Sequence, residues 1–250
     1  MEILGIDVGG TGIKGAVVNV ETGEMLTERK RFLTPQPATP EAVTNTVADL
    51  VRHFDWQGTV GCGFPAVIRG GGVYTAANIS KRWLGTNARD LFAEATGCTV
   101  HVANDADVAG LAEMCFGAGR GRHGVVMVLT LGTGIGSAIF VDGRLYPNTE
   151  LGHLEVDGHE AEKWTSAKVR DDEKLGWKEW TKRLNVFLER IHVYLWPDLI
   201  ILGGGVSKKH EKFIPKLKVD VEIVPAQMRN QAGIIGAALF AGEPRTGRAS

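Results

Sequence analysis

Two glycine-rich turns carry residue types that could bind a phosphate chain. The first, Asp7-Val8-Gly9-Gly10-Thr11-Gly12, follows an apolar run at residues 3–6. Its glycines let the backbone reverse and bring N–H groups close to a ligand, forming the concave donor cluster that accepts phosphate oxygens. The Asp7 carboxylate would repel a phosphate unless a divalent cation such as Mg²⁺, with retained water, lay between them. The turn therefore indicates binding of phosphate together with a metal; the alternative is an ordinary hairpin turn.

The second turn repeats the first. Thr11-Gly12-Ile13-Lys14-Gly15-Ala16 recurs as Thr133-Gly134-Ile135-Gly136-Ser137-Ala138, each between apolar runs, which predicts a duplicated chain. The second turn leads into a strand and not a helix, so it is not the dinucleotide-binding fingerprint, and Lys14 lies beyond the first turn, so no GxxxxGK[ST] loop exists. Two such turns, one in each lobe, would hold a phosphate chain from both sides.

A third glycine cluster, Gly203-Gly204-Gly205, separates the apolar run at 199–202 from Val206-Ser207-Lys208-Lys209. A strand that ends in glycines lets a ligand approach the backbone, and a following helix would direct its positive N-terminus at that ligand. A tight strand-to-helix turn explains the same residues equally well.

Asn104 and Asp105 stand where a strand at 99–103 meets a helix that starts at residue 106. The carboxyl ends of strands are where α/β sheets place ligands, and a carboxylate there can accept a proton from an attacking hydroxyl. A helix N-cap is an equal alternative for Asp105. Asp107 is explained by the dipole of the first helical turn, and we assign it no chemistry.

Glu150, His153 and Glu162 offer carboxylates and an imidazole within a short stretch of chain. Such groups suit the hydroxyls of a sugar, because each hydroxyl both donates and accepts a hydrogen bond. Taken singly, a histidine near a turn is more often a surface residue. The spacing of Glu150, His153 and His159 matches none of the usual zinc patterns, so metal binding there is disfavoured.

The order of apolar patterns predicts layered sheets flanked by helices. Strands are expected at residues 3–6, 13–20, 59–64, 99–102, 125–131, 137–141 and 199–202. Helices are expected at residues 40–54, 88–95, 106–116, 177–195 and 232–241, and a hairpin turn at 70–72.

The composition narrows the function classes. Of 250 residues, 44% are hydrophobic and 23% are charged, which indicates a globular protein, and 28 basic against 29 acidic side chains leave a net charge of −1. That balance lacks the basic excess of a nucleic-acid or membrane-surface binder. Three isolated cysteines argue against a disulfide framework, and no signal peptide or spanning helix is evident, so we expect a cytoplasmic protein.

Five segments together resemble one protein family. They are DVGGTGIKG at 7–15, NDAD at 104–107, LGTGIGSA at 131–138, ELGH at 150–153 and ILGGGVSK at 201–208. In this set and order the chain resembles the ROK family of sugar kinases and regulators, within the actin-like superfamily of two-lobed ATPases. Segments 76–83, 158–162, 224–226 and 229–238 resemble the polyphosphate-using glucokinases and glucomannokinases of that family more closely.

The resemblance implies an α/β, actin-like (ribonuclease H-like) duplicated fold with a cleft between two lobes. The small lobe would comprise residues 1–103, completed by a helix at 232–244, and the large lobe residues 104–231. It also implies transfer of a phosphoryl group from inorganic polyphosphate to the 6-hydroxyl of glucose, with Mg²⁺, in a homodimer. ATP is a second candidate donor and mannose a second candidate sugar.

Residue roles are also implied by the resemblance. Asp105 would be the general base, with sugar contacts from Asn78, Asn104, Asp105, Glu150, His153 and Glu162. The donor site would comprise Asp7, Gly9, Gly10, Thr11, Lys14, Thr133, Gly134, Gly204 and Gly205. Many ROK kinases carry a CxCGxxGC zinc site after the ELGH-like segment, but here no cysteine follows His153, so no structural zinc is expected.

Two other functions fit parts of the sequence. One is an ATP-dependent ROK kinase acting on a hexose or an N-acetylhexosamine. The other is a catalytically silent, sugar-sensing module, against which the presence of Asp105 and of the intact Asp7 turn argues. A comparison of ATP with long-chain polyphosphate as donor would separate these alternatives.

Overall fold

The computed structural model describes residues 1–77 and 79–243, which form two compact units. Unit 1 comprises Met1–Ala112 and the C-terminal stretch from Gln231, and unit 2 comprises Glu113–Asn230. The sequence placed this boundary after residue 103. The structure places it inside helix α3 (Asp105–Phe116), so the first two turns of that helix belong to unit 1.

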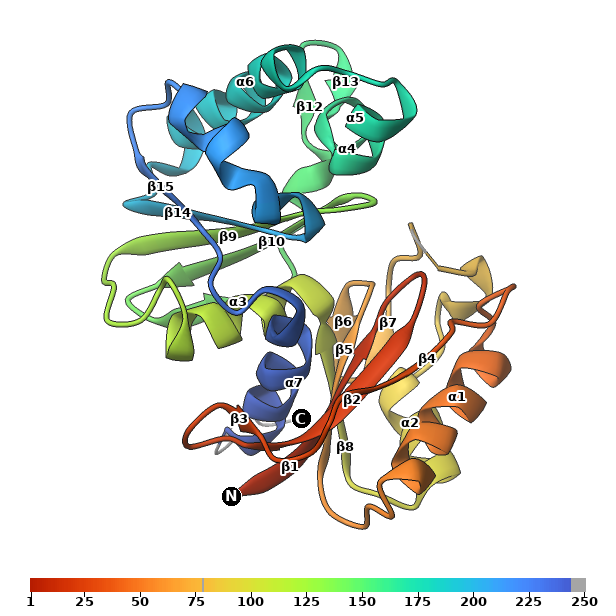
Figure 1. Ribbon diagram of the computed structural model, residues 1–250. Helices are drawn as coiled ribbons and strands as arrows, with labels where there is room; N and C mark the ends of the chain where they lie inside the picture. Colours follow the sequence, from red (N-terminus) through yellow and green to blue (C-terminus); the bar gives the residue numbers. More distant parts are fainter. Residues whose placement is uncertain (78, 244–250) are drawn as a thin grey trace. The chain divides into compact units, whose positions relative to one another are not determined.

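Unit 1 is built on a six-stranded sheet (Figure 1). Strand β1 (Glu2–Val8) pairs antiparallel with β2 (Ile13–Asn19), and parallel with β5 (Val60–Phe64), which in turn pairs parallel with β8 (Val100–Asn104). Short strands β3 (Glu24–Met25) and β4 (Lys30–Phe32) both pair with β2. A separate hairpin, β6 (Ile68–Arg69) with β7 (Gly72–Val73), confirms the turn predicted at the three consecutive glycines.

Helices cover both faces of this sheet. On one face lie α1 (Pro40–His53), capped by the Thr39 side chain, and α2 (Ala88–Thr96), capped by Asn87. They bury an aromatic cluster of Phe64, Trp83 and Phe92, with Trp83 supplied by the 3₁₀ helix η1 (Lys81–Trp83). On the other face α7 (Ala232–Gly242) packs on β1, β5 and β8. Both faces of the central strands are therefore buried, as their continuous apolar sequence predicts.

Unit 2 contains a five-stranded sheet with the same plan. Strand β9 (Val125–Leu131) pairs antiparallel with β10 (Ile135–Val141), and parallel with β14 (Leu199–Gly203), which pairs parallel with the edge strand β15 (Glu222–Pro225). Strand β11 (Arg144–Tyr146) completes the sheet beside β10. In both units a glycine turn joins the first two strands, which confirms that the predicted repeat is structural.

The core of unit 2 lies between its sheet and helix α6 (Trp177–Leu195). Helix α6, predicted at residues 177–195, buries an apolar stripe that includes Trp180, Leu184 and Phe187 against Leu129 and Ile200 of the sheet. The remaining elements are η2 (Leu151–His153), the hairpin β12 (Glu155–Val156) and β13 (His159–Glu160), α4 (Ala161–Thr165), α5 (Ala167–Asp172), η3 (Gly205–Lys212), η4 (Ile214–Lys216) and η5 (Arg229–Gln231).

One predicted helix is of a different type. The segment after Gly204 forms the 3₁₀ helix η3, and Lys209 within it has non-helical dihedral angles, φ −115° and ψ 27°. Such tight helices have poor hydrogen-bond geometry and seldom run far without a break. The expected α-helical N-terminus beside Gly205 is therefore replaced by a kinked 3₁₀ segment.

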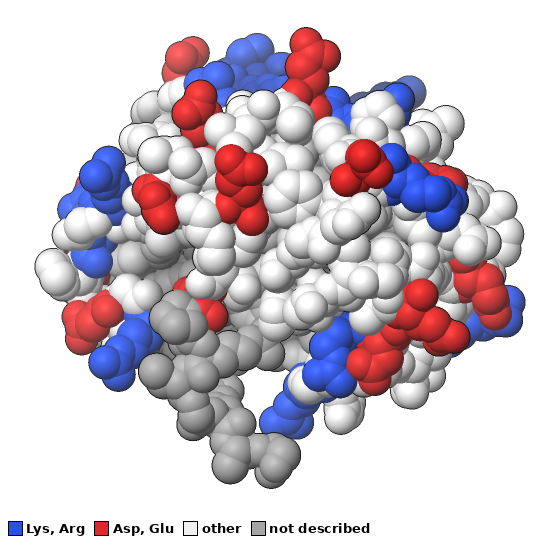
Figure 2. All heavy atoms as spheres, turned by 90° about the horizontal axis from the view of Figure 1, so that it is seen from below, with Lys and Arg blue, Asp and Glu red and all other residues white. Residues whose placement is uncertain are grey.

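The charged side chains are mixed in sign. Figure 2 shows Lys and Arg interspersed with Asp and Glu on one face, without a large region of one sign among the described residues of that face. Among the described residues, none of the helices combines the length and the apolar character needed to cross a bilayer.

Candidate active site

In unit 1, the sheet register brings the first glycine turn and Asp105 to the same edge. Asp7 pairs with Gly63 of β5, and Gly63 pairs with Ala103 of β8. Because these three strands are parallel, their carboxyl ends share one edge, and two strand spacings separate Asp7 from Ala103 by about 10 Å. Asp105 follows Ala103 by two residues, so it stands at the same edge of the sheet as the first glycine turn.

Asn104 fixes the start of α3. Its Oδ1 accepts hydrogen bonds from the backbone N–H groups of Ala106 at 2.9 Å and Asp107 at 3.1 Å, and its Nδ2 donates to the Ala66 carbonyl at 3.1 Å. The cap considered for Asp105 is therefore supplied by Asn104, which is 5% exposed. Asp105 is the first helical residue, half-buried, and also accepts the Ala106 N–H at 2.8 Å. The helix terminus favours a negative carboxylate at this position.

The first turn is a narrow hairpin with two cations beside it, Lys14 and Arg31, which are paired in register on neighbouring strands. The Gly9 N–H donates to the Gly12 carbonyl at 3.1 Å, while Lys14 forms an ion pair with Asp7 at 3.0 Å. Arg31 donates to the Thr11 carbonyl at 2.9 Å. A side chain at Gly10 would meet no atom within 4 Å, so packing does not explain that glycine and the turn has room for a ligand.

Two contributors to this turn were missed from the sequence. Thr34 donates to the Gly9 carbonyl at 2.5 Å, and a cavity of about 320 Å³ lies beside Gly10, lined also by Gln36 and Ile79. Arg31 is the second contributor, 20 residues beyond Thr11. The strand pairing of β4 with β2 carries it there, and nothing in the local sequence signals that pairing.

In unit 2, the second turn opens into a cavity of about 440 Å³. The Gly132 N–H donates to the Gly134 carbonyl at 3.0 Å, and the Lys168 N–H donates to the Gly132 carbonyl at 3.0 Å. We name the space the donor cavity; its lining includes Thr133, Lys168, Arg170, Asp171, Asp172, Trp177, Gly205 and Lys209. Lys168 pairs with Asp172 and Arg170 with Asp171, which leaves Lys209 as the lining cation without an acidic partner in this set. The Arg170 guanidinium lies 3.9 Å from the centre of the Trp177 ring, a cation–π contact that holds a positive charge at the wall.

The third glycine cluster fits both interpretations of its sequence, a tight turn and a place where a ligand approaches the backbone. Gly204 has φ +81°, and a Cβ there would lie 2.2 Å from the Leu131 carbonyl oxygen, so a tight turn requires this glycine. A Cβ at Gly205 would meet nothing within 4 Å, and Gly205 lines the donor cavity. Packing thus explains Gly204, while Gly205 leaves space for a ligand.

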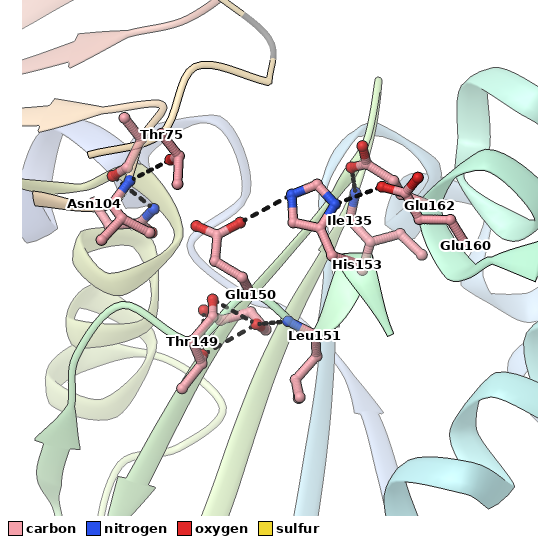
Figure 3. A network of polar contacts seen from close by, with 12 residues as sticks. Thr75, Asn104, Ile135, Thr149, Glu150, Leu151, His153, Glu160 and Glu162 are labelled. Carbon is pink, nitrogen blue, oxygen red and sulfur yellow. Dashed lines mark hydrogen bonds and ion pairs between the residues drawn. The ribbon is translucent and has the colours of Figure 1, made fainter. Parts of the chain in front are cut away.

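Three of the six predicted sugar-binding residues, Glu150, His153 and Glu162, lie together in unit 2 (Figure 3). The His153 ring lies between two carboxylates: Nε2 is 3.5 Å from Glu150 Oε2, and Nδ1 is 2.5 Å from Glu160 Oε1. Glu162 accepts the Ile135 backbone N–H at 3.3 Å. Ile135 directly follows the second glycine turn, so this group is hydrogen-bonded to the first residue of β10, next to the turn that lines the donor cavity.

The ends of the Glu150 segment are held by one buried serine. Ser137 of β10 donates its hydroxyl to the Thr149 carbonyl at 2.8 Å, and its Oγ accepts the Leu151 N–H at 3.0 Å. The residues on both sides of Glu150 are therefore fixed to the strand next to the second glycine turn. This anchoring holds the backbone on either side of the Glu150 carboxylate in place.

The carboxylates and the imidazole change one another's ionisation. Burial raises the pKa of Glu150, with the Glu162 charge adding to the rise and His153 opposing it. Burial acts to lower the pKa of His153, but the hydrogen bond to Glu160 and the charges of Glu162, Glu150 and Glu160 outweigh it and raise that pKa. Hydrogen bonds from Lys163 and His153 hold the Glu160 pKa low.

Glu160 is the residue of this group that the sequence analysis missed. An ionised carboxylate only accepts, so the Glu160 contact requires the proton on His153 Nδ1 and turns Nε2 toward Glu150. Its only signal was its place in the segment 158–162. His153, Glu160 and Glu162 also offer three ligand atoms within 4.8 Å of one another, which a divalent ion could use, although Lys163 already pairs with Glu160.

Glu160→Gln is expected to lower the pKa of His153, because the substitution removes one negative charge and the ionic hydrogen bond to Nδ1. The measurement is an NMR titration of the imidazole protons. Glu155→Gln is the matched control, since Glu155 faces Glu160 across the hairpin and is exposed. An unchanged His153 pKa in Glu160→Gln, or an equal fall in the control, would contradict the assignment.

The same shift predicts a pH dependence of stability. The His153 pKa is raised above its ordinary 6.5, so its stabilising contribution is complete below pH 6.5 and is lost as the pH rises through the raised value. The free energy of unfolding of Glu160→Gln is therefore expected to fall less than that of the wild type as the pH rises from 6.5 through the raised pKa of His153.

The predicted residues divide between the two units. Asp7, Gly9, Gly10, Thr11, Lys14, Asn104 and Asp105 lie in unit 1, and Thr133, Gly134, Glu150, His153, Glu162, Gly204 and Gly205 lie in unit 2. Asn78 lies outside the described residues. Each unit thus brings one glycine turn together with one set of polar side chains.

Comparisons with known proteins point to the same family as the sequence motifs. The ROK family model matches residues 3–173. The chain is 50% identical over 236 residues to a polyphosphate glucokinase of Mycobacterium tuberculosis (strain CDC 1551 / Oshkosh), covering 94% of this chain and 89% of the relative.

Solved structures agree as well. The inorganic polyphosphate/ATP-glucomannokinase of Arthrobacter sp. strain KM is 47% identical, with a TM-score of 0.92 over 95% of this chain and 97% of that one. A ROK glucokinase of Streptomyces griseus shares the fold at 23% identity, with a TM-score of 0.83 over 96% of this chain and 99% of that one. The predicted α/β, actin-like fold is thereby confirmed, and the chain belongs to the ROK family.

Proposed function

We propose that this protein transfers a phosphoryl group from inorganic polyphosphate to the 6-hydroxyl of glucose. The observation that carries the proposal is the hydrogen bond from Ile135 to Glu162, which joins a sugar-type group of side chains to the turn that opens into the donor cavity. The choice of substrates rests on the 50% identity to a polyphosphate glucokinase over nearly the whole chain. ATP and mannose are the second candidates, because the Arthrobacter relative is named for both.

The sugar would be held chiefly by Glu150, His153 and Glu162. Their carboxylates accept hydrogen bonds from hydroxyl groups, and His153 Nε2, protonated below its raised pKa, donates one in return. Because Ser137 and Glu160 fix Glu150 and His153 before the sugar arrives, little ordering entropy is lost on binding. Asn104 and Asp105 complete the sugar site in this proposal, together with Asn78.

Asp105 would act as the general base. The 6-hydroxyl proton passes to its carboxylate as the oxygen forms a bond to the terminal phosphorus, and the shortened polyphosphate leaves with the electrons of the broken P–O bond. Phosphoryl transfer requires little covalent chemistry from the protein, so positioning and charge neutralisation lower the barrier. The backbone N–H groups of the two turns, with Lys14, supply that neutralisation.

The residues at the first turn fit a magnesium ion bound chiefly by phosphate and water. Asp7 is one carboxylate at the turn, and the side chain of Lys14 already balances its charge. One carboxylate with substrate phosphates is the usual protein contribution to a Mg²⁺ site. When bound, Mg²⁺ would neutralise phosphate charge. A cytoplasmic location and a homodimer complete the proposal, and light scattering of the purified protein tests the latter.

A donor comparison tests the proposed function. Purified protein with glucose, Mg²⁺ and either long-chain polyphosphate or ATP is expected to form glucose 6-phosphate faster from polyphosphate, measured with a coupled dehydrogenase. Turnover with ATP alone would instead support the ATP-dependent kinase. Glucose binding without turnover from either donor would support the sugar-sensing module.

A further inference from the structure

A second cavity in unit 2 has no part in the site described above. It measures about 490 Å³ and is lined by Arg122, Arg229, His210 and Ser207 together with parts of β15 and the segment after it. We name it the distal cavity. Among the residues that the structure describes, its lining contains two arginines and a histidine and no acidic side chain, which is the composition of an anion site.

The distal cavity and the donor cavity share one wall, the 3₁₀ helix η3. Gly205, Val206 and Lys209 line the donor cavity, whereas Ser207 and His210 line the distal cavity. Eight residues of 3₁₀ helix span about 16 Å, so the two cavities lie within one short element of each other. Lys208, Lys209 and Lys212 on this helix are exposed, as is Glu211, so the helix carries a net positive charge.

The walls of the distal cavity are held by a buried carboxylate. Glu113, 1% exposed, accepts backbone N–H groups from Ala118 at 3.0 Å, Gln227 at 3.1 Å and Met228 at 2.7 Å. It thereby joins the segment after α3 to the segment after β15, and these two segments carry Arg122 and Arg229. Three amide donors use its oxygens, so the carboxylate is tied into the wall.

The cationic side chains remain accessible. Arg122 pairs with Glu222 at the surface, with 42% of its side chain exposed, and a guanidinium has further N–H donors for a second anion. The His210 ring is oriented by a contact of 3.1 Å between Nδ1 and the Ser207 carbonyl. Ser207 in turn donates its hydroxyl to the Gly204 carbonyl at 2.8 Å, which ties this wall to the third glycine cluster.

We propose that the distal cavity binds the far part of a polyphosphate chain whose reacting end lies in the donor cavity, with η3 between them. The proposal rests on the proposed function for the identity of the ligand. A linear polyanion fits because successive phosphates can meet Lys209, η3 and then Arg122 and Arg229. A nucleoside triphosphate carries its charge at one end and ends in a base, so it cannot supply phosphates to both cavities.

The test is a double variant, Arg122→Gln with Arg229→Gln. Its matched control is Arg120→Gln with Arg144→Gln, two exposed arginines of unit 2 that line neither cavity. The KM for long-chain polyphosphate is expected to rise on the order of 10-fold in the double variant. The control variant is expected to keep the wild-type KM for long-chain polyphosphate. In the double variant, the KM for tripolyphosphate or ATP and the affinity for glucose are expected to change little. Unchanged melting temperatures show that both variants fold.

Direct binding of fluorescent long-chain polyphosphate, without glucose, separates the two proposals. If only the double variant binds the chain more weakly, the result supports the distal cavity proposal. This holds even if the wild-type protein forms no glucose 6-phosphate, because that outcome would refute only the proposed function. Equal binding by the wild type, the double variant and the control would overturn the distal cavity proposal. A KM for ATP that rises as much as that for long chains would also overturn it, because the cavity would then hold the nucleotide.

Discussion

Asp105→Asn is expected to lower kcat for glucose phosphorylation by roughly 100-fold or more, the usual effect of losing a general base. The KM for glucose should change far less, because an amide still forms hydrogen bonds to the sugar hydroxyl. The variant preserves the shape of the side chain and its contact with the Ala106 N–H. Because Asn104 caps α3, the helix start does not depend on the Asp105 charge.

The control for Asp105 is Asp90→Asn. Asp90 also lies in the first turn of a helix, α2, but its side chain is 60% exposed and pairs with Arg89. The same loss of charge there should leave kcat unchanged. Steady-state rates for both variants under saturating donor decide the question. Wild-type turnover in Asp105→Asn would remove Asp105 from the mechanism.

Gly236→Ala is expected to destabilise unit 1 strongly. A Cβ at this position in α7 would lie 1.6 Å from the carbonyl oxygen of Val108 and 2.4 Å from its carbonyl carbon. Both are backbone atoms of α3, so no side-chain rotation relieves the clash and the two helices must separate. Overpacking of this kind costs about 3 kcal/mol. For a chain of this length that corresponds to a fall in Tm of roughly 6–12 °C.

Gly242→Ala, in the same helix, is the matched control. A Cβ there would meet the Cε of Met1 at 2.9 Å and the Cδ1 of Ile3 at 3.2 Å, both ends of side chains that can shift by a few tenths of an ångström. Alanine favours helix over glycine by up to about 1 kcal/mol, so this variant should be neutral or slightly more stable. Thermal unfolding followed by circular dichroism compares the two. Equal melting temperatures for Gly236→Ala and wild type would show that α7 does not pack as closely as described.

Features set by local patterns were predictable from the sequence. The strands on either side of both glycine turns, and the apolar stripe of Trp180, Leu184 and Phe187, follow from periodicity and turn chemistry within a few residues. The ROK motifs also lie in contiguous segments, so the family was identifiable. The glycine turns and the Glu150–His153 group were therefore located from the sequence before their geometry was known.

Features set by tertiary packing were not predictable. Glu160 reaches His153 only because the hairpin of β12 and β13 folds back over η2, and Arg31 reaches Thr11 only through the pairing of β4 with β2. The distal cavity combines Arg122, His210 and Arg229 from segments up to 107 residues apart. The 3₁₀ form of η3 also escaped prediction, because composition does not distinguish it from an α-helix.

Helix α7 determines the order in which the two units can fold during synthesis. A ribosome delivers the chain from its N-terminus at about 5–20 residues per second, so α7 emerges roughly 6–26 s after Ala112. Unit 2, which is continuous in sequence, is complete before α7 appears, while one apolar face of β1, β5 and β8 still lacks its cover. A chain truncated before Ala232 would never cover that face of the sheet, and its N-terminal part would then be a substrate for chaperones.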